Sequence, residues 1–356
     1  MKAALLGIEH PHSLAHLGTL QVLPEVEGIL LWDENQAALD EVQRTKGEKV
    51  EATFTNLDAL LAQDDLFFVI AALRNDLGPD IFVRVLEAGV HLMAEKPIGK
   101  TAADTARVIE VAERQDRALG VCYQNRYNPL VAQARELVAQ GLLGPLISVD
   151  VRMLTTQVQF RNPQHWLFNK ELAGGGILSW LGCHNIDMIR HITQDEIVAV
   201  AAEVASRNDA AIDVEDIAAL SLRLGSGAIG SMHAGYTLAL SGAGYHNPSG
   251  YDTYFGLNGQ LGRMYWSTTG QANHLSVETT HPDWAGAPQR EFDFALAASP
   301  AYAGVPGENF LRAFIHAAQK GGTGPASGRD ALQVARVIDA AYESSQSGRR
   351  VEIETG

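Results

Sequence analysis

Apolar and polar residues alternate along the first third of the chain in a way that predicts strands separated by helices. Short apolar runs, typical of buried strands, are followed by stretches whose apolar residues recur with the period of a helix. The predicted strands cover residues 2–6, 28–32, 52–54, 66–72, 90–93 and 118–123. Pro11 and Pro79 are placed to open helices, and Thr101 with Asp104 forms a capping-box pattern. This alternation predicts a doubly wound parallel sheet of the α/β class.

The pattern changes after residue 124. One helix is predicted over 128–139, and helical patterns return at 308–319 and 329–345. Between them, longer alternating runs predict strands at 146–154, 197–206, 217–224, 228–238, 251–257, 261–267 and 274–280. Tight turns between alternating strands indicate a mainly antiparallel sheet. We therefore predict a first domain over residues 1–123 and an α+β domain over 124–356, whose last helix can pack back on the first domain.

Composition narrows the class of protein. With 356 residues, 46% of them hydrophobic and 19% charged, the chain is globular and long enough for two domains. Its net charge of -15 and pI of about 5.2 argue against nucleic acid or an anionic membrane as a partner, because both require basic surfaces. Cys122 and Cys183 form no CxxC pair, so neither a disulfide framework nor a metal site is predicted. No segment reads as a signal peptide or membrane span, and we expect a cytoplasmic enzyme.

Two predicted strand ends carry candidate chemistry. The strand that ends in Met93-Ala94 stops at Glu95-Lys96-Pro97, and proline cannot continue a central strand. Ligands of open parallel sheets bind beyond the carboxyl ends of the strands, and the pKa of a lysine shifts readily there, so Lys96 is a candidate for proton chemistry. Asp33, 26 residues after Gly7, is placed to accept a hydrogen bond from a ribose 2′-hydroxyl, which favours NAD over NADP. Solvated surface turns are the alternative for both positions.

The first predicted strand-to-helix turn departs from a dinucleotide-binding loop. Such a loop has the pattern G-x-G-x-x-G, whereas residues 7–12 read Gly-Ile-Glu-His-Pro-His. Glu9 adds a negative charge where a pyrophosphate would rest. The helix N-terminus still favours an anion, and His10, His12 and Ser13 are able to donate hydrogen bonds to it. A structural turn without a ligand is the alternative.

A second informative stretch covers residues 172–187. Three glycines, Gly174 to Gly176, lead into a helical pattern, and glycine permits close approach of backbone or ligand. With 3.6 residues per turn, Trp180, His184, Asp187 and His191 share one face. Core packing is the alternative, but an aromatic ring, an imidazole and a carboxylate on one line favour a site.

These motifs resemble the glucose-fructose oxidoreductase and inositol dehydrogenase family (Gfo/Idh/MocA) over nearly the whole chain. The residues that carry the resemblance are Glu95-Lys96-Pro97, Asn125 to Pro129, Trp166, the glycine triplet with Gly182, His184 and Asp187, and Val214-Glu215-Asp216. The resemblance implies an N-terminal Rossmann doubly wound parallel sheet and a C-terminal α+β domain with a large, mainly antiparallel open sheet. It also implies an NAD(P)-dependent dehydrogenase acting on a sugar, cyclitol or related polyol.

The resemblance also assigns roles. Lys96 would hydrogen-bond the reacting oxygen and help bind the nicotinamide, His184 would take or give the proton, and Asp187 would orient His184 or bind a hydroxyl. The expected cofactor-binding residues are Gly7, Glu9, His10, His12, Asp33, Asn75, Glu95, Lys96, Pro97 and Asn125. The expected substrate-binding residues are Lys96, Arg126, Trp166, Trp180, His184 and Asp187.

Trp180 stands where the family commonly has an aspartate, and we predict that its ring forms a stacking wall for a sugar. Further candidates to line the site are Tyr236, Tyr245, His246 and His165, with specificity expected in loops 157–167 and 241–250. Two other functions stay open: an NAD-dependent glycoside-cleaving enzyme without net redox, and a non-catalytic nucleotide or sugar sensor. Because an open sheet face needs covering, we expect a homodimer or homotetramer formed through it.

Overall fold

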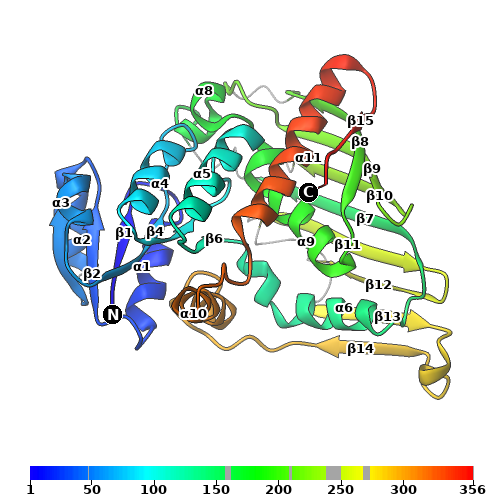
Figure 1. The fold of residues 1–356 in the computed structure, drawn as a ribbon. Coiled ribbons are helices and arrows are strands. Elements are labelled where there is room, and N and C mark those ends of the chain that lie inside the picture. The colour runs from blue at the N-terminus through cyan, green and yellow to red at the C-terminus, as the bar shows by residue number, and fades with distance from the viewer. Residues whose placement is uncertain (47, 157–161, 208–210, 238–249, 268–272, 356) are drawn as a thin grey trace. The chain divides into compact units, whose positions relative to one another are not determined.

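The computed structural model describes residues 1–46, 48–156, 162–207, 211–237, 250–267 and 273–355 (Figure 1). Residue contacts divide the chain into two compact units. Unit 1 consists of Met1–Tyr127 and Leu296–Leu332, and unit 2 of Asn128–Ala295 and Gln333–Gly356. Among the described residues, no helix has both the length and the apolar character that crossing a bilayer requires.

Unit 1 is built on a six-stranded parallel sheet. Its strands are β1 (Lys2–Leu6), β2 (Gly28–Trp32), β3 (Val50–Phe54), β4 (Leu66–Ala71), β5 (His91–Ala94) and β6 (Leu119–Val121). They lie in the order β3-β2-β1-β4-β5-β6, and all of their pairings are parallel. This is the strand order of the doubly wound dinucleotide-binding fold, so the predicted class is confirmed. All five residues of β2 and four of the five in β1 are buried, as expected for strands covered on both faces.

The helices of unit 1 begin where the sequence chemistry allows. They are α1 (Ser13–Val22), α2 (Gln36–Lys46), α3 (Leu57–Leu61), α4 (Gly78–Glu87), α5 (Ala102–Arg114), the 3₁₀-helix η1 (Gln124–Tyr127), α10 (Val305–Gln319) and the start of α11 (Gly328–Ser347). The capping box of Thr101 and Asp104 is present at α5, and Pro79 lies in the first turn of α4, as predicted. Pro11 does not open α1. The His12 N–H donates to Nδ1 of His10, and the Ser13 N–H donates to the His10 carbonyl. These bonds close a turn before the helix starts.

Unit 2 is built on a nine-stranded sheet. Its strands are β7 (Leu146–Thr155), β8 (Ile197–Ala205), β9 (Ile217–Leu224), β10 (Ile229–Gly235), β11 (Tyr251–Gly259), β12 (Gly262–Ser267), β13 (His274–Thr279), β14 (Gln289–Asp293) and β15 (Val351–Glu352). They lie in the order β14-β13-β12-β11-β7-β10-β9-β8-β15. The pairings are antiparallel except β7 with β10, which confirms a mainly antiparallel sheet. Along β9, buried and exposed residues alternate as predicted.

One face of this sheet carries helices. Those of unit 2 are α6 (Pro129–Ala139), η2 (Trp166–Phe168), α8 (Lys170–Ala173), η3 (Leu178–Gly182), α9 (Cys183–Thr193), η4 (Pro282–Trp284) and most of α11. Helices α6 and α9 contact each other and lie over strands β13 and β7 (Figure 1). The single α-helix predicted after the glycine triplet is interrupted, because η3 is a π-helix. The 3.6-residue phase therefore holds from Cys183 onward and not from Trp180.

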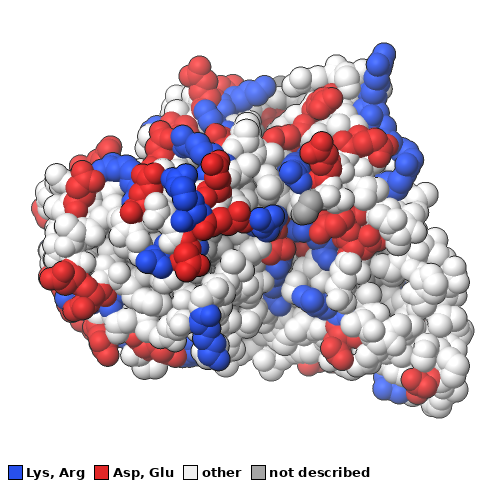
Figure 2. Space-filling view, viewed as in Figure 1, with Lys and Arg blue, Asp and Glu red and all other residues white. Residues whose placement is uncertain are grey.

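The face shown in Figure 2 carries charges of both signs. Figure 2 shows acidic and basic side chains interspersed on the face in view, which carries no extended basic area. This agrees with the acidic net charge of -15.

Candidate active site

The tip of β5 brings a carboxylate and an amine into the interior of unit 1. The Glu95 N–H bonds to the carbonyl of Ala71, which fixes the backbone where the strand ends. Glu95 is 3% exposed and Lys96 only 1%, and the peptide bond from Lys96 to Pro97 is cis. A solvated surface turn is therefore not what the structure shows at this position.

Two histidines of the first turn and helix hold the Glu95 carboxylate. His12 Nδ1 lies 3.0 Å and His16 Nε2 2.8 Å from Glu95 Oε1, while Oε2 accepts the Lys96 backbone N–H at 2.9 Å. Tyr302, from the segment before α10, places its hydroxyl 3.1 Å from His12 Nδ1. His12, predicted as a cofactor ligand, is thus bound to a neighbouring protein group.

The charges of this cluster follow from its burial. Desolvation alone would raise the pKa of Glu95, but His12, His16 and Lys96 hold that pKa well below its usual range. Burial lowers the pKa of His12 and lowers that of His10 well below its ordinary value, against the opposing effect of Glu95. We therefore expect an ionised Glu95 that accepts N–H bonds from the imidazoles of His12 and His16.

The first loop has the first glycine and the helix start of a dinucleotide-binding site, but it lacks the later glycines of the motif. Gly7 has φ +84°, and a Cβ there would lie 2.1 Å from the carbonyl oxygen of Ala72. No side chain caps α1, and although the Ser13 N–H bonds to the His10 carbonyl, a helix N-terminus favours an anion. The exposed Glu9 accepts a hydrogen bond from Asn35 at 3.0 Å.

Asp33 ties the end of β2 to this loop. Its carboxylate is 9% exposed and accepts the backbone N–H groups of Ile8 at 2.6 Å and Asn35 at 2.9 Å. A fixed carboxylate at this strand end fits the ribose of a dinucleotide. The loop, the helix start and Asp33 together fit the cofactor that the fold implies.

The other predicted residues of unit 1 lie at neighbouring strand ends. Asn75 is buried in the turn after β4, and Asn125 is half-buried in η1. Arg126 is 8% exposed and bonds the Pro325 carbonyl at 2.9 Å and the Asp330 carboxylate at 3.0 Å. These bonds join η1 to the start of α11, which is an anchoring role that the sequence reasoning did not foresee.

In unit 2 the glycine triplet wraps around a buried carboxylate. Glu215 accepts the N–H groups of Gly176 at 2.6 Å and Leu178 at 3.0 Å, and the hydroxyl of Tyr342 at 2.9 Å. A Cβ on Gly175 would lie 1.9 Å from the Tyr342 hydroxyl, and one on Gly176 would lie 2.0 Å from the Glu215 carbonyl oxygen. The glycines are therefore required by the close approach of these groups.

This turn positions the π-helix and α9, which carry the remaining candidates. His184 is 9% exposed and Asp187 1%, and both lie on the first turns of α9 at spacing i, i+3. Trp180 is 3% exposed, and its ring packs edge-to-face on the half-buried Trp166 with centroids 6.2 Å apart. A ring this buried offers a ligand little of its face, and the stacking role of Trp180 stays a prediction.

Two of the four further candidates to line the site lie within the described residues. Tyr236 is buried and packs against Phe168, while His165 caps η2 through Nδ1 and its ring lies tilted beside that of Trp166. Tyr245 and His246 lie outside the described residues, as do most of the loop 241–250 and the start of the loop 157–167.

Sequence reasoning missed His16, Tyr302 and Tyr342, and it gave Glu215 no role. Their partners lie at sequence separations of 79 for His16 to Glu95, 290 for Tyr302 to His12 and 127 for Tyr342 to Glu215. No local pattern reports contacts of that range. The available signal was the strand-end rule, which places whatever surrounds Glu95 and Asp33 in a binding region.

The doubly wound sheet has the strand order of dinucleotide-binding folds, and the charged tip of β5 lies at the strand ends where their ligands bind. Residues 4–123 match the family model described as "Oxidoreductase family, NAD-binding Rossmann fold", and residues 131–265 match "GFO/IDH/MocA C-terminal domain". The chain belongs to this family, as the sequence motifs indicated.

Named relatives and solved structures agree with the assignment. The chain is 26% identical to "D-xylose 1-dehydrogenase (NADP(+)) 2" of Haloferax volcanii, with 96% of this chain and 98% of the relative covered. It is 26% identical to "Inositol 2-dehydrogenase" of Rhizobium meliloti, with 83% and 84% covered. The structure of levoglucosan dehydrogenase in complex with NADH and levoglucosan superposes with a TM-score of 0.87 at 22% identity and covers 100% of both chains, which shows the shared fold.

Proposed function

We propose that this protein is an NAD(P)-dependent dehydrogenase or reductase that acts on a CH–OH group of a sugar, cyclitol or related polyol. The observation that carries the proposal is the buried Glu95-Lys96 pair at the carboxyl end of β5, in a sheet of dinucleotide-binding order. The names of relatives that act on xylose, inositol and apiose support the substrate class.

In this proposal three side chains handle the reacting hydroxyl. The nicotinamide, when bound, accepts or supplies the hydride. Lys96 donates a hydrogen bond to the reacting oxygen, and His184 takes its proton in oxidation or returns it in reduction. Asp187, one turn along α9 from His184, orients the imidazole or binds a second hydroxyl. Arg126, Trp166 and Trp180 complete the proposed substrate-binding set.

The cofactor is proposed to be NAD. The carboxylate of Asp33 suits a ribose 2′-hydroxyl and repels a 2′-phosphate, so NADP is the second choice. The proposal keeps the loop residues Gly7, Glu9, His10 and His12 with Asn75, Pro97 and Asn125 around the dinucleotide. The bond from His12 to Glu95 supports a role at the nicotinamide end rather than at the phosphates.

Residues 1–123 are proposed to bind the dinucleotide and residues 124–356 to bind the substrate and mediate assembly. A homodimer or homotetramer through the exposed face of the nine-stranded sheet, working in the cytoplasm, completes the proposal. The alternating exposed residues of β9 and β10 support an open face that a second copy can cover.

A dehydrogenase screen tests the proposal. Purified protein is supplied with a panel of sugars and cyclitols and with NAD or NADP, and NAD(P)H absorbance is followed. We expect turnover with at least one polyol, and Lys96→Ala and His184→Asn each lowering kcat by about 100-fold or more. The matched controls are Lys320→Ala and His316→Asn, which change exposed side chains of α10 and its end.

The result that refutes the proposal is a panel without any absorbance change. Product release without net NADH formation would instead select glycoside cleavage, and ligand-induced thermal stabilisation without turnover would select a sensor. Unchanged kcat in both site variants would remove Lys96 and His184 from the mechanism.

A further inference from the structure

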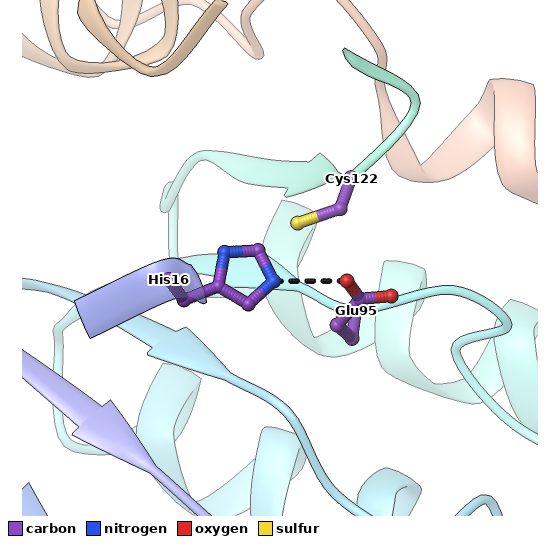
Figure 3. A group of neighbouring side chains, drawn as sticks. All are labelled: His16, Glu95 and Cys122. Atoms are coloured by element: carbon purple, nitrogen blue, oxygen red, sulfur yellow. Dashed lines mark hydrogen bonds and ion pairs between the residues drawn. The ribbon is translucent and has the colours of Figure 1, made fainter. Parts of the chain in front are cut away.

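Three metal-ligating side chains meet in the interior of unit 1 although the sequence places them far apart. His16 comes from α1, Glu95 from the tip of β5 and Cys122 from the residue after β6 (Figure 3). One nitrogen, one carboxylate oxygen and the sulfur all lie within 4.8 Å of one another. The three residues are 5%, 3% and 4% exposed.

The backbone fixes two of these residues side by side. The Cys122 N–H bonds to the carbonyl of Ala94 at 3.0 Å, and the Glu95 N–H bonds to that of Ala71 at 2.8 Å. His16 Nε2 already lies 2.8 Å from Glu95 Oε1. In tetrahedral zinc sites, ligand atoms at about 2.0–2.3 Å from the ion stand roughly 3.3–3.7 Å apart. The His16–Glu95 separation is 2.8 Å and none of the three exceeds 4.8 Å, so small side-chain shifts would bring the three atoms to an ion.

A small cavity lies beside His16 and Cys122, and one of its lining residues carries an unpaired acceptor. Its volume is about 20 Å³, and His16, Cys122 and Gln124 line it together with apolar side chains that include Ile70 and Met93. Gln124 is 6% exposed, and its Oε1 has no hydrogen-bond partner among the described residues. A buried carbonyl oxygen without a partner is costly, and a cation or a water in this cavity would satisfy it.

We propose that His16, Glu95 and Cys122, with the Gln124 carbonyl oxygen as a fourth donor, form a binding site for a divalent transition-metal ion of the zinc class. Imidazole, carboxylate and thiolate are the zinc ligands of proteins. The charges balance, because the carboxylate and the thiolate together offset the two charges of the ion. The N–H of His12 then supports the ligating carboxylate from outside, as partners of metal ligands usually do.

Binding requires one proton to leave. Without a metal, Cys122 is a neutral thiol, because burial raises its pKa well above the ordinary value. The ion replaces that proton, which passes to solvent, and a zinc–sulfur bond forms in place of the sulfur–hydrogen bond. When Nε2 of His16 turns to the ion, the ring carries its proton on Nδ1. No electron is transferred.

Cobalt substitution tests the site independently of any enzymatic activity. Full-length protein freed of metal with a chelator is titrated with Co²⁺, and the near-ultraviolet absorption of thiolate-to-cobalt charge transfer is recorded. We expect this band to saturate at one equivalent and to disappear when Zn²⁺ is added. Cys122→Ser should lack the band, whereas Cys183→Ser, which changes the other buried cysteine, in α9, should retain it.

Glu95→Gln is the second variant and should weaken Co²⁺ binding by at least about tenfold. Loss of a group that only hydrogen-bonds a metal ligand already lowers metal affinity by about that factor, and loss of a ligand itself costs no less. Circular dichroism and melting curves identify the variants that fold, and Cys122→Ala replaces Cys122→Ser if the latter does not. Absence of the band in the parent protein overturns the proposal and leaves a water as the occupant of the cavity. A band that persists without Cys122, or that is lost without Cys183, also overturns it.

Discussion

Replacing Glu215 with alanine should damage unit 2 more than its single lost carboxylate suggests. The side chain fills the turn of the glycine triplet and accepts hydrogen bonds from Gly176, Leu178 and Tyr342 at 2.6–3.0 Å. In Glu215→Ala, two backbone N–H groups and a phenol hydroxyl lose their acceptor in a buried turn. The strain falls on the residues that lead into η3 and α9, which carry Trp180 and His184.

Two opposing effects set how much Glu215→Ala should lower the free energy of unfolding. A hydrogen bond to a charged group contributes about 1.5–3 kcal/mol, so three bonds set an upper limit of about 5–9 kcal/mol. Against this, burial raises the pKa of Glu215 in spite of those bonds, so the ionised carboxyl is less favourable in the fold than in water. We expect Glu215→Ala to lower the free energy of unfolding by about 3 kcal/mol, and Glu215→Gln by about 1–2 kcal/mol because the amide oxygen still accepts.

The raised pKa adds a dependence on pH. The folded protein binds the Glu215 proton more tightly than the unfolded chain does, so this stabilising contribution is complete below the ordinary pKa of 4.5. It is lost as the pH rises through the folded-state pKa. The difference in unfolding free energy between the parent protein and Glu215→Gln should therefore be larger near pH 4 than near pH 8.

Urea unfolding followed by tryptophan fluorescence measures these effects in the right unit. Four of the five tryptophans belong to unit 2, namely Trp166, Trp180, Trp266 and Trp284. Glu203→Ala is the matched control, because Glu203 is an exposed glutamate of β8 in the same unit. A Glu215→Ala variant within about 0.5 kcal/mol of that control, the usual range of surface substitutions, would refute the reasoning.

Three further predictions concern other contacts. Burial alone would raise the pKa of Asp330, but Arg126 outweighs it and lowers the pKa from the ordinary 3.8 to about 2. Up to about 2 kcal/mol of stability should therefore be lost as the pH falls from 4 toward 2. Acid titration of the melting temperature should show this loss in the parent protein and not in Asp330→Asn. Gly176→Ala should cost several kcal/mol in urea unfolding, whereas Gly286→Ala, where a Cβ meets nothing within 4 Å, should stay within about 1 kcal/mol. Asp33→Ala should weaken NADH binding, followed by NADH fluorescence, by about tenfold or more, and equal affinity would remove Asp33 from the cofactor site.

The strands were predictable where hydrophobic patterning alone decides them. Strands form over the predicted ranges 2–6, 28–32 and 217–224, because the pattern of apolar side chains there indicates directly whether one face or both faces are buried. The edge strands β14 and β15 were not predicted. β14 reads Gln-Arg-Glu-Phe-Asp, and four of its five residues are exposed, so it carries no apolar alternation.

The candidate site was predictable at its local motifs and not in its contacts. The strand-end rule locates Lys96, and the capping chemistry of Thr101 locates the helix that follows. The π-helix that contains Trp180 follows the glycine turn anchored by Glu215, and no local sequence pattern predicts it. The histidine pair on Glu95 depends on where the first turn and α1 lie relative to the tip of β5, which only tertiary structure reveals.

The discontinuity of unit 1 has a consequence for synthesis. Its first segment ends at Tyr127, but α10 and the start of α11 enter it from Leu296–Leu332. Phe314 of α10 packs edge-to-face on Phe68 of β4, with ring centroids 6.2 Å apart, so this aromatic contact awaits the late segment. At about 5–20 residues per second, the ribosome needs roughly 10–40 s to make the 205 residues from Asn128 to Leu332, the end of the late segment. During that time the first segment of unit 1 exposes the apolar surface that α10 later contacts, and we expect chaperones to bind it.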